Sequence, residues 1–138
     1  MIAGIAILLL DQITKTFFGT RDFFVGSIHF HQAKNYGLPF GLNFNPGINA
    51  VVIGIAVFII YYFCFKKKQE NYIGLVLVGS GAFSNVLDRI SLGYVRDFID
   101  LGMGFTFNFA DVAIIIGLFF LSFCKQLLRD KEQKNKHN

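Results

Sequence analysis

The stretch YIGLVLVGSGAFSNVLDR, residues 72–89, decides the fold, because a long apolar run ends there in a group of polar residues. A helix needs roughly 20 mostly apolar residues to cross a bilayer, and the run is close to that length. Three similar runs occur at 1–18, 48–65 and 109–124. The sequence therefore predicts an all-α membrane protein with four transmembrane helices, at about 1–18, 48–65, 72–88 and 108–124.

The composition agrees with a membrane protein. Of the 138 residues, 54% are hydrophobic and only 16% are charged, with 18 Phe and no Trp. These values exclude an ordinary soluble domain and a disordered chain. The net charge of +4 comes from a few segregated cations, so we expect it to reflect membrane topology and expect no nucleic-acid partner.

The basic residues predict the orientation of the helices. Eight of the 13 follow the second and fourth apolar runs, namely Lys66, Lys67, Lys68, Lys125, Arg129, Lys131, Lys134 and Lys136. By the positive-inside rule the loop 66–71 and the tail 125–138 are cytoplasmic, as are both termini, within a single membrane domain, 1–138. The first run has no charged residues before it, which argues against a cleaved signal peptide and is consistent with a slightly truncated start.

The two outward segments, 19–47 and 89–107, are more than plain loops. The alternation in DFFVGSIHFHQ, residues 22–32, predicts short strands or an extended hairpin. Glycine and proline after Asn35 predict a turn-rich platform. The second outward segment is amphipathic and rich in Phe, which is typical of chain lying in the membrane interface. The full expectation is thus four spans, a small extracytoplasmic β-like platform and an amphipathic interfacial segment.

Several polar residues lie within or beside the apolar runs, where they are energetically expensive and usually face the bundle interior. Asp11 and Lys15 are four residues apart on one helix face, which predicts a structural ion pair. Asn85, Asp88 and Arg89 also share a face at the end of the third run. In this second group Asn85 can donate to Asp88, and Arg89 can pair with Asp88 or with the carbonyls of a ligand. The alternative is a helix-terminal network that reaches toward the interface.

A second cluster begins the fourth run. Asn108 and Asp111 are three residues apart, and a carboxylate in the first turn of a helix is favoured by the helix dipole, so capping alone could explain Asp111. A sharper hypothesis pairs Asp111 with an acid from the 88–100 region, because two adjacent carboxyl groups share one proton and can activate water. Spacing alone leaves open whether Asp88 or Asp97 is the partner.

Five motifs in order resemble the lipoprotein signal peptidase family (signal peptidase II). They are DQITK at 11–15, NYGLPFG at 35–41, GAFSNVLDR at 81–89, GYVRDF at 93–98 and FNFAD at 107–111. Each motif alone is weak, but the five together cover nearly the whole chain. The resemblance implies an aspartic endopeptidase of the bacterial inner membrane, with its active site near the outer face. Such enzymes remove the signal peptide from prolipoproteins, just before a diacylglyceryl-modified Cys.

The resemblance also assigns roles to residues. It implies that Asp97 and Asp111 are the catalytic carboxylates. It implies that the positions lining or supporting the substrate and inhibitor site are Asn35, Gly37, Asn85, Asp88, Arg89, Val95, Asn108 and Ala110. It implies contacts with membrane lipids and inhibition by globomycin-type cyclic peptides. We expect no cofactor and no metal, since this chemistry needs neither.

The chain departs from the family pattern in two places. Phe83 and Ser84 stand where the family has smaller residues or glycine, which bears on the packing of the third span. Only 13 residues separate Asp97 from Asp111, a shorter connection than the family leads one to expect. Two other classes of function remain open. A small proton-coupled transporter also keeps acids within its membrane spans, and a non-catalytic membrane assembly factor would tolerate the loss of Asp97 or Asp111 singly.

Overall fold

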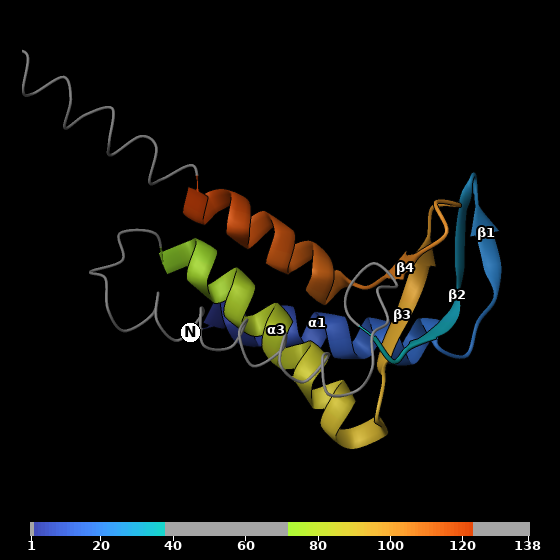
Figure 1. The fold of residues 1–138 in the computed structure, drawn as a ribbon, viewed down its shortest axis with the longest axis horizontal. Helices are drawn as coiled ribbons and strands as arrows, with labels where there is room; N and C mark the ends of the chain where they lie inside the picture. Colours follow the sequence, from blue (N-terminus) through green and yellow to red (C-terminus); the bar gives the residue numbers. More distant parts are fainter. Residues whose placement is uncertain (1, 38–71, 123–138) are drawn as a thin grey trace, which may run out of the picture.

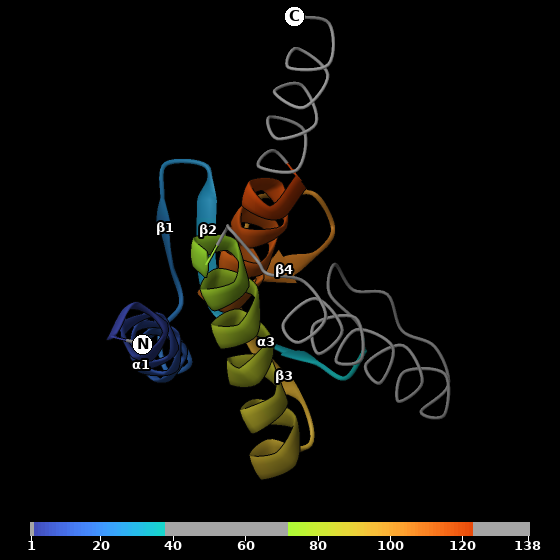
Figure 2. The ribbon, with the colours of Figure 1, turned by 90° about the vertical axis from the view of Figure 1, so that its left-hand side faces the viewer.

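The computed structural model describes residues 2–37 and 72–122, and it contains three helices and a small sheet within these ranges. The helices are α1 (Ile2–Phe18), α3 (Tyr72–Leu92) and the Phe109–Ser122 helix. They lie side by side, and the sheet lies at one end of them (Figures 1 and 2). The predicted second span, 48–65, the loop 66–71 and the tail 125–138 lie outside the described residues.

The helices have polar residues inside and apolar residues outside. In α1 the buried residues are Asp11 and Lys15, whereas Ile5, Leu9 and Ile13 are exposed. This arrangement suits an apolar solvent, in which charged groups must find partners within the protein. In the described part of the chain, α3 alone is long and apolar enough by itself to cross a membrane, and Phe109–Ser122 is a shorter apolar helix.

The sheet contains four antiparallel strands in the order β1-β2-β3-β4. Their bounds are Phe23–Val25, Ile28–Asn35, Val95–Asp100 and Thr106–Phe107. The turn between the first two strands contains Gly26 with φ 61°, a backbone conformation that glycine adopts without strain. Phe18 of α1 stacks on Phe30 and Phe98 with ring centroids 5.0 and 4.8 Å apart, so aromatic contacts join the sheet to the helix.

Small residues bring α3 against the Phe109–Ser122 helix. A Cβ atom added at Gly81 would overlap the carbonyl oxygen of Ala110, and one added at Gly74 would lie 2.9 Å from that of Gly117. Such close backbone approach is typical of membrane helices, where packing replaces the hydrophobic effect. It places the polar ends of α3 and of its neighbour side by side.

Two boundaries differ from the sequence expectation. The third helix extends to Leu92 instead of ending at 88, and Gly93 (φ 81°) follows it with its amide bonded to the Arg89 carbonyl. The segment 89–107, expected to be an amphipathic interfacial segment, contains β3 and β4. Burial explains the difference, because Val95, Phe98 and Ile99 of β3 are at most 8% exposed and pack as part of a paired sheet.

Candidate active site

The site is a buried cluster of polar side chains at the junction between the helices and the sheet. Its members are at most 5% exposed and are Asp11, Lys15, Ser84, Asn85, Asp88, Asp97, Asn108 and Asp111. Within the described residues, every buried side-chain nitrogen or oxygen has a hydrogen-bond partner. A buried polar network is stable only when its polar atoms are hydrogen-bonded in this way.

Lys15 is the cation at the centre of the cluster. Its Nζ lies 2.7 Å from Asp11 Oδ2 and 3.2 Å from Asp88 Oδ2, and it donates to Asn85 Oδ1 at 2.9 Å. These three acceptors match the three donors of an ammonium group. The predicted ion pair between Asp11 and Lys15 is therefore present, as part of a larger network.

Asp88 is surrounded by cations. Arg96 Nη2 lies 2.7 Å from Asp88 Oδ1, while the backbone amide of Arg96 donates to Oδ2 at 3.0 Å. Gln12 Nε2 also donates to Oδ1, at 3.1 Å. With Lys15 on the same carboxylate, these charges favour ionised Asp88 in a structural ion-pair network.

Asp97 and Asp111 are joined by Asn108. The Asn108 side chain donates to Asp97 Oδ1 at 2.6 Å, and its Oδ1 accepts the Asp111 amide at 3.0 Å. Asn85 Nδ2 donates to Asp111 Oδ1 at 2.8 Å. β3 therefore brings Asp97 to the N-terminal end of the Phe109–Ser122 helix, where it meets Asp111, and Asp88 is held apart by its cations.

The surroundings of Asp97 set its protonation state. The side chain is 1% exposed, and Asn35 Nδ2 donates to Oδ2 at 2.9 Å. Burial, and then the negative charge of Asp111, raises the pKa of Asp97 to about 7, against the opposing effect of two amide donors. Asp97 can therefore hold a proton near neutral pH while remaining able to release it.

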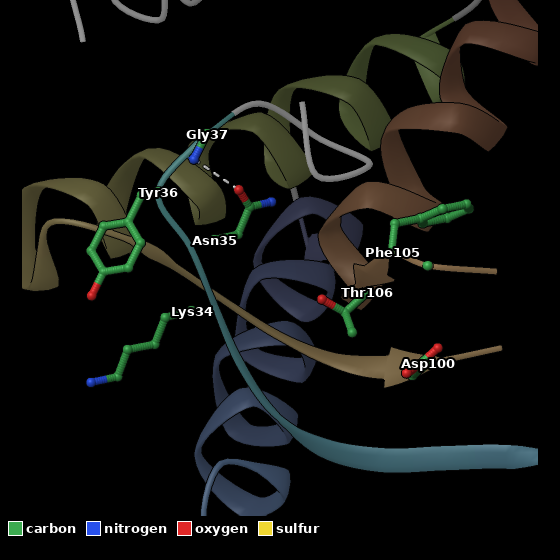
Figure 3. Close-up of a pocket in the computed structure, with 8 residues that line it drawn as sticks. Lys34, Asn35, Tyr36, Gly37, Asp100, Phe105 and Thr106 are labelled. Carbon is green, nitrogen blue, oxygen red and sulfur yellow. Dashed lines mark hydrogen bonds between the residues drawn. The ribbon is translucent and has the colours of Figure 1, made fainter. Parts of the chain in front are cut away.

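Asn35 and Gly37 form the edge of the site. Gly37 donates its amide to Asn35 Oδ1 at 2.9 Å, and its carbonyl accepts Arg89 Nη2 at 2.7 Å. A cavity of about 390 Å³ opens next to them (Figure 3). Its lining consists of Lys34, Asn35, Tyr36, Gly37, Asp100, Gly104, Phe105 and Thr106. Asn35 also donates to Asp97, so this one side chain links the lining of the cavity to the carboxylate.

The remaining predicted residues act through the backbone or through packing. Ala110 is fully buried and donates its amide to Asp11 Oδ1 at 2.8 Å. Val95 is 2% exposed and pairs with Asn35 across the sheet. Of the two substituted positions, Phe83 is 53% exposed on the outer surface, whereas Ser84 is fully buried and donates to Asp11 Oδ2 at 2.6 Å.

Sequence reasoning did not single out Gln12, Arg96 and Ser84 as members of this network. Gln12 precedes Lys15 by three residues and Ser84 precedes Asp88 by four, and these spacings, which share a helix face, were the available signal. Arg96 carries no such signal, because its contact with Asp88 depends on where β3 lies. Its guanidinium Nη2 also donates to Gln12 Oε1 at 2.7 Å, which ties β3 to α1.

The chain is similar to known proteins along most of its length. The family model described as Signal peptidase (SPase) II matches residues 3–126. The lipoprotein signal peptidase of Psychromonas ingrahamii is 32% identical, with 95% of this chain and 88% of the relative covered. That of Syntrophomonas wolfei is 31% identical, covering 94% and 93%. A bacterial membrane enzyme solved in meso at 2.3 Å resolution is 27% identical, with a TM-score of 0.74 over 95% of this chain and 88% of that one.

A fold with charged groups inside and apolar groups outside, together with these matches, defines the class as the membrane-bound peptidases. The chain belongs to the signal peptidase II family. Membership in a family of peptidases makes the chain a protease, and the matches favour neither a transporter nor a non-catalytic assembly factor. Aspartic catalysis is the mechanism of this family.

Proposed function

We propose that this protein is an aspartic endopeptidase that removes the signal peptide from diacylglyceryl-modified prolipoproteins, cutting just before the lipidated Cys. The observation that carries the proposal is the pair of buried carboxylates, Asp97 bonded by the Asn108 side chain and Asp111 bonded by the Asn85 side chain. The relatives named as lipoprotein signal peptidases support the choice of substrate.

Asp97 and Asp111 have different roles in the proposed reaction. Asp97 holds the shared proton, in keeping with its pKa of about 7. Asp111 is the ionised partner, since it lies in the first turn of a helix and accepts a hydrogen bond from Asn85. The Asp111 carboxylate takes a proton from a water molecule, whose oxygen attacks the scissile carbonyl carbon. Asp97 gives its proton to the carbonyl oxygen.

The resulting tetrahedral intermediate then breaks its C–N bond. Asp111 returns the proton to the departing amine, and Asp97 recovers its proton from a hydroxyl of the intermediate. The product is a free carboxylic acid on the signal peptide and a free amino group on the lipidated Cys. Asn85 and Asn108 hold the two acids in place, while Asp88 and Arg89 support the walls of the site through their contacts with Arg96 and Gly37.

We further propose the membrane arrangement that suits this reaction. Four helices cross the bacterial inner membrane with both termini in the cytoplasm, and the sheet and the carboxylate pair lie near the outer face. The exposed apolar surface of α1 and α3 contacts lipid acyl chains, and a lipidated precursor approaches through that surface. The cavity beside Asn35 accepts polar backbone of the substrate or a globomycin-type peptide.

The test is cleavage of a lipidated precursor by purified protein in lipid or detergent. Asp97→Asn and Asp111→Asn should each lower kcat by at least about 100-fold, because an amide neither donates nor accepts the required proton. Asp130→Asn, which changes an acid in the predicted cytoplasmic tail, should leave kcat unchanged. Unfolding temperatures close to that of the wild type would show that the inactive variants are folded. Turnover by Asp111→Asn at the rate of the wild type would exclude the proposed mechanism.

A further inference from the structure

Two histidines and an aspartate gather on the sheet, apart from the carboxylate pair. His29 and His31 belong to β2, and Asp100 ends β3. One ligand atom from each side chain lies within 4.8 Å of the others. Each of these side chains is about one quarter exposed, so solvent reaches the cluster.

The strand geometry accounts for the cluster. Residues two apart on a strand point to the same face, which places His29 beside His31. Their rings stack with centroids 4.3 Å apart. Asp100 is the direct partner of His29 in the antiparallel pairing of β2 with β3. The register of this pairing shifts between Phe30 and Ala33, the interval that contains His31, and such shifts commonly redirect a side chain.

Hydrogen bonds already orient all three groups, since Asp100 Oδ1 also accepts the Gly102 amide at 2.7 Å. His31 Nε2 lies 3.4 Å from Asp100 Oδ2, and His29 Nε2 lies 2.7 Å from Asp22 Oδ1. Binding of an ion through the other ring nitrogen of His29 would leave Asp22 as the carboxylate that holds the imidazole in place. That arrangement is frequent around metal-bound histidines.

We propose that His29, His31 and Asp100 form a binding site for a divalent transition-metal ion, with Zn²⁺ as the preferred species. Imidazole and carboxylate together are ligands that suit Zn²⁺, and a fourth position remains for water. Ligand atoms around tetrahedral Zn²⁺ lie about 3.3 Å apart, so the present arrangement closes by small side-chain rotations. The bound ion would link β2 to β3. This departs from the expectation of no metal, which concerned the peptidase chemistry.

The test is titration of Zn²⁺ into the purified full-length chain without a polyhistidine tag, followed by isothermal calorimetry. We expect one equivalent to bind, and we expect His29→Ala, His31→Ala and Asp100→Asn each to weaken binding at least 10-fold. His137→Ala changes the third histidine of the chain and serves as the matched control, with unchanged affinity. Zn²⁺ should also raise the unfolding temperature of the wild type and of the control, because an ion that binds the folded state stabilises it.

Three results would overturn the proposal. They are the absence of saturable binding by the wild type, the same affinity in a His29→Ala/His31→Ala double variant, and loss of binding in His137→Ala. Folding of the double variant is checked by cleavage of a lipidated precursor without added metal. That activity should remain near the wild-type rate, since neither histidine contacts the carboxylate pair.

Discussion

Lys15→Met removes the positive charge at the centre of the buried network and keeps an unbranched side chain of similar length. In the native protein, Lys15 Nζ contacts Asp11, Asp88 and Asn85 at 2.7, 3.2 and 2.9 Å. Methionine leaves these three acceptors without that donor. The variant therefore tests whether the ammonium group stabilises the buried acids.

The expected magnitude follows from the partners that remain. Asp88 keeps its three contacts with Arg96, so its charge stays compensated. Asp11 keeps two neutral donors, Ser84 Oγ and the Ala110 amide, but loses the cation that pairs with it. Breaking a buried ion pair costs about 3–5 kcal/mol, and the retained donors favour the lower end, about 3 kcal/mol. For a chain of this size, that loss lowers the unfolding temperature by about 10 °C.

The assay is thermal unfolding in one detergent, with Lys34→Met as the matched control. Lys34 is exposed and lies 5.1 Å from the centre of the Tyr94 ring. Loss of such a contact costs only about 0.5–1 kcal/mol. The Lys15→Met/Asp11→Asn double variant should recover part of the stability, because an amide at position 11 needs no cation.

Equal unfolding temperatures for Lys15→Met and Lys34→Met would refute the reasoning. So would a double variant less stable than Lys15→Met alone, since that result would mean that the Asp11 charge is compensated without Lys15.

Other positions test the same geometry independently. Burial, and then the negative charge of Asp111, raises the pKa of Asp97 from 3.8 to about 7. Folding therefore takes up a proton between these two pH values. The free energy of unfolding therefore falls as pH rises from about 4 to about 7. Asp97→Asn should flatten this dependence on pH in unfolding experiments. An unchanged slope would contradict the raised pKa of Asp97. In the wild type, kcat/KM should fall as pH rises above about 7, because the proton donor is lost. Gly81→Val should destabilise the protein by about 1–3 kcal/mol, since its side chain meets a carbonyl of the adjacent helix. Gly79→Val, with nothing within 4 Å of the added Cβ, is its control, and equal unfolding temperatures would argue against tight packing at position 81. Ser84→Ala should cost about 1–3 kcal/mol, because it removes a donor from a buried carboxylate. The exposed Ser91→Ala should cost almost nothing in the same thermal assay.

Helical spacing predicted the parts of the site that depend on one helix at a time. Asp11 with Lys15, and Asn85 with Asp88, lie on the faces that a period of 3.6 residues assigns to them. The need to compensate charges inside an apolar environment also predicted that these faces point inward. Both arguments are local, and they require no knowledge of how the helices meet.

The partners across the fold could not be predicted in this way. Asp88 and Asp97 are both near Asp111 in the sequence, but in the structure their carboxylates have different partners. Cations occupy the oxygens of Asp88, whereas neutral amides contact Asp97. That difference arises from the pairing of β3 with β2, which places Arg96 over the end of α3. The expectation of an interfacial segment at 89–107 missed this pairing, because an amphipathic, Phe-rich pattern does not identify a partner strand.

The hairpin formed by β3 and β4 gives the short connection between Asp97 and Asp111 a further meaning. Ile99 pairs with Phe107, and Asp100 pairs with Thr106. This strand pairing, and not the turn at 101–105, therefore sets the spacing of the two acids. Residues added within that turn would lengthen a closed loop at small entropic cost, without shifting the strands. The first part of the turn, 101–103, is thus a point at which loop length can diverge between relatives. An epitope or fluorophore inserted there would preserve the distance between the carboxylates and would leave Gly104 and Phe105, which line the cavity, in place.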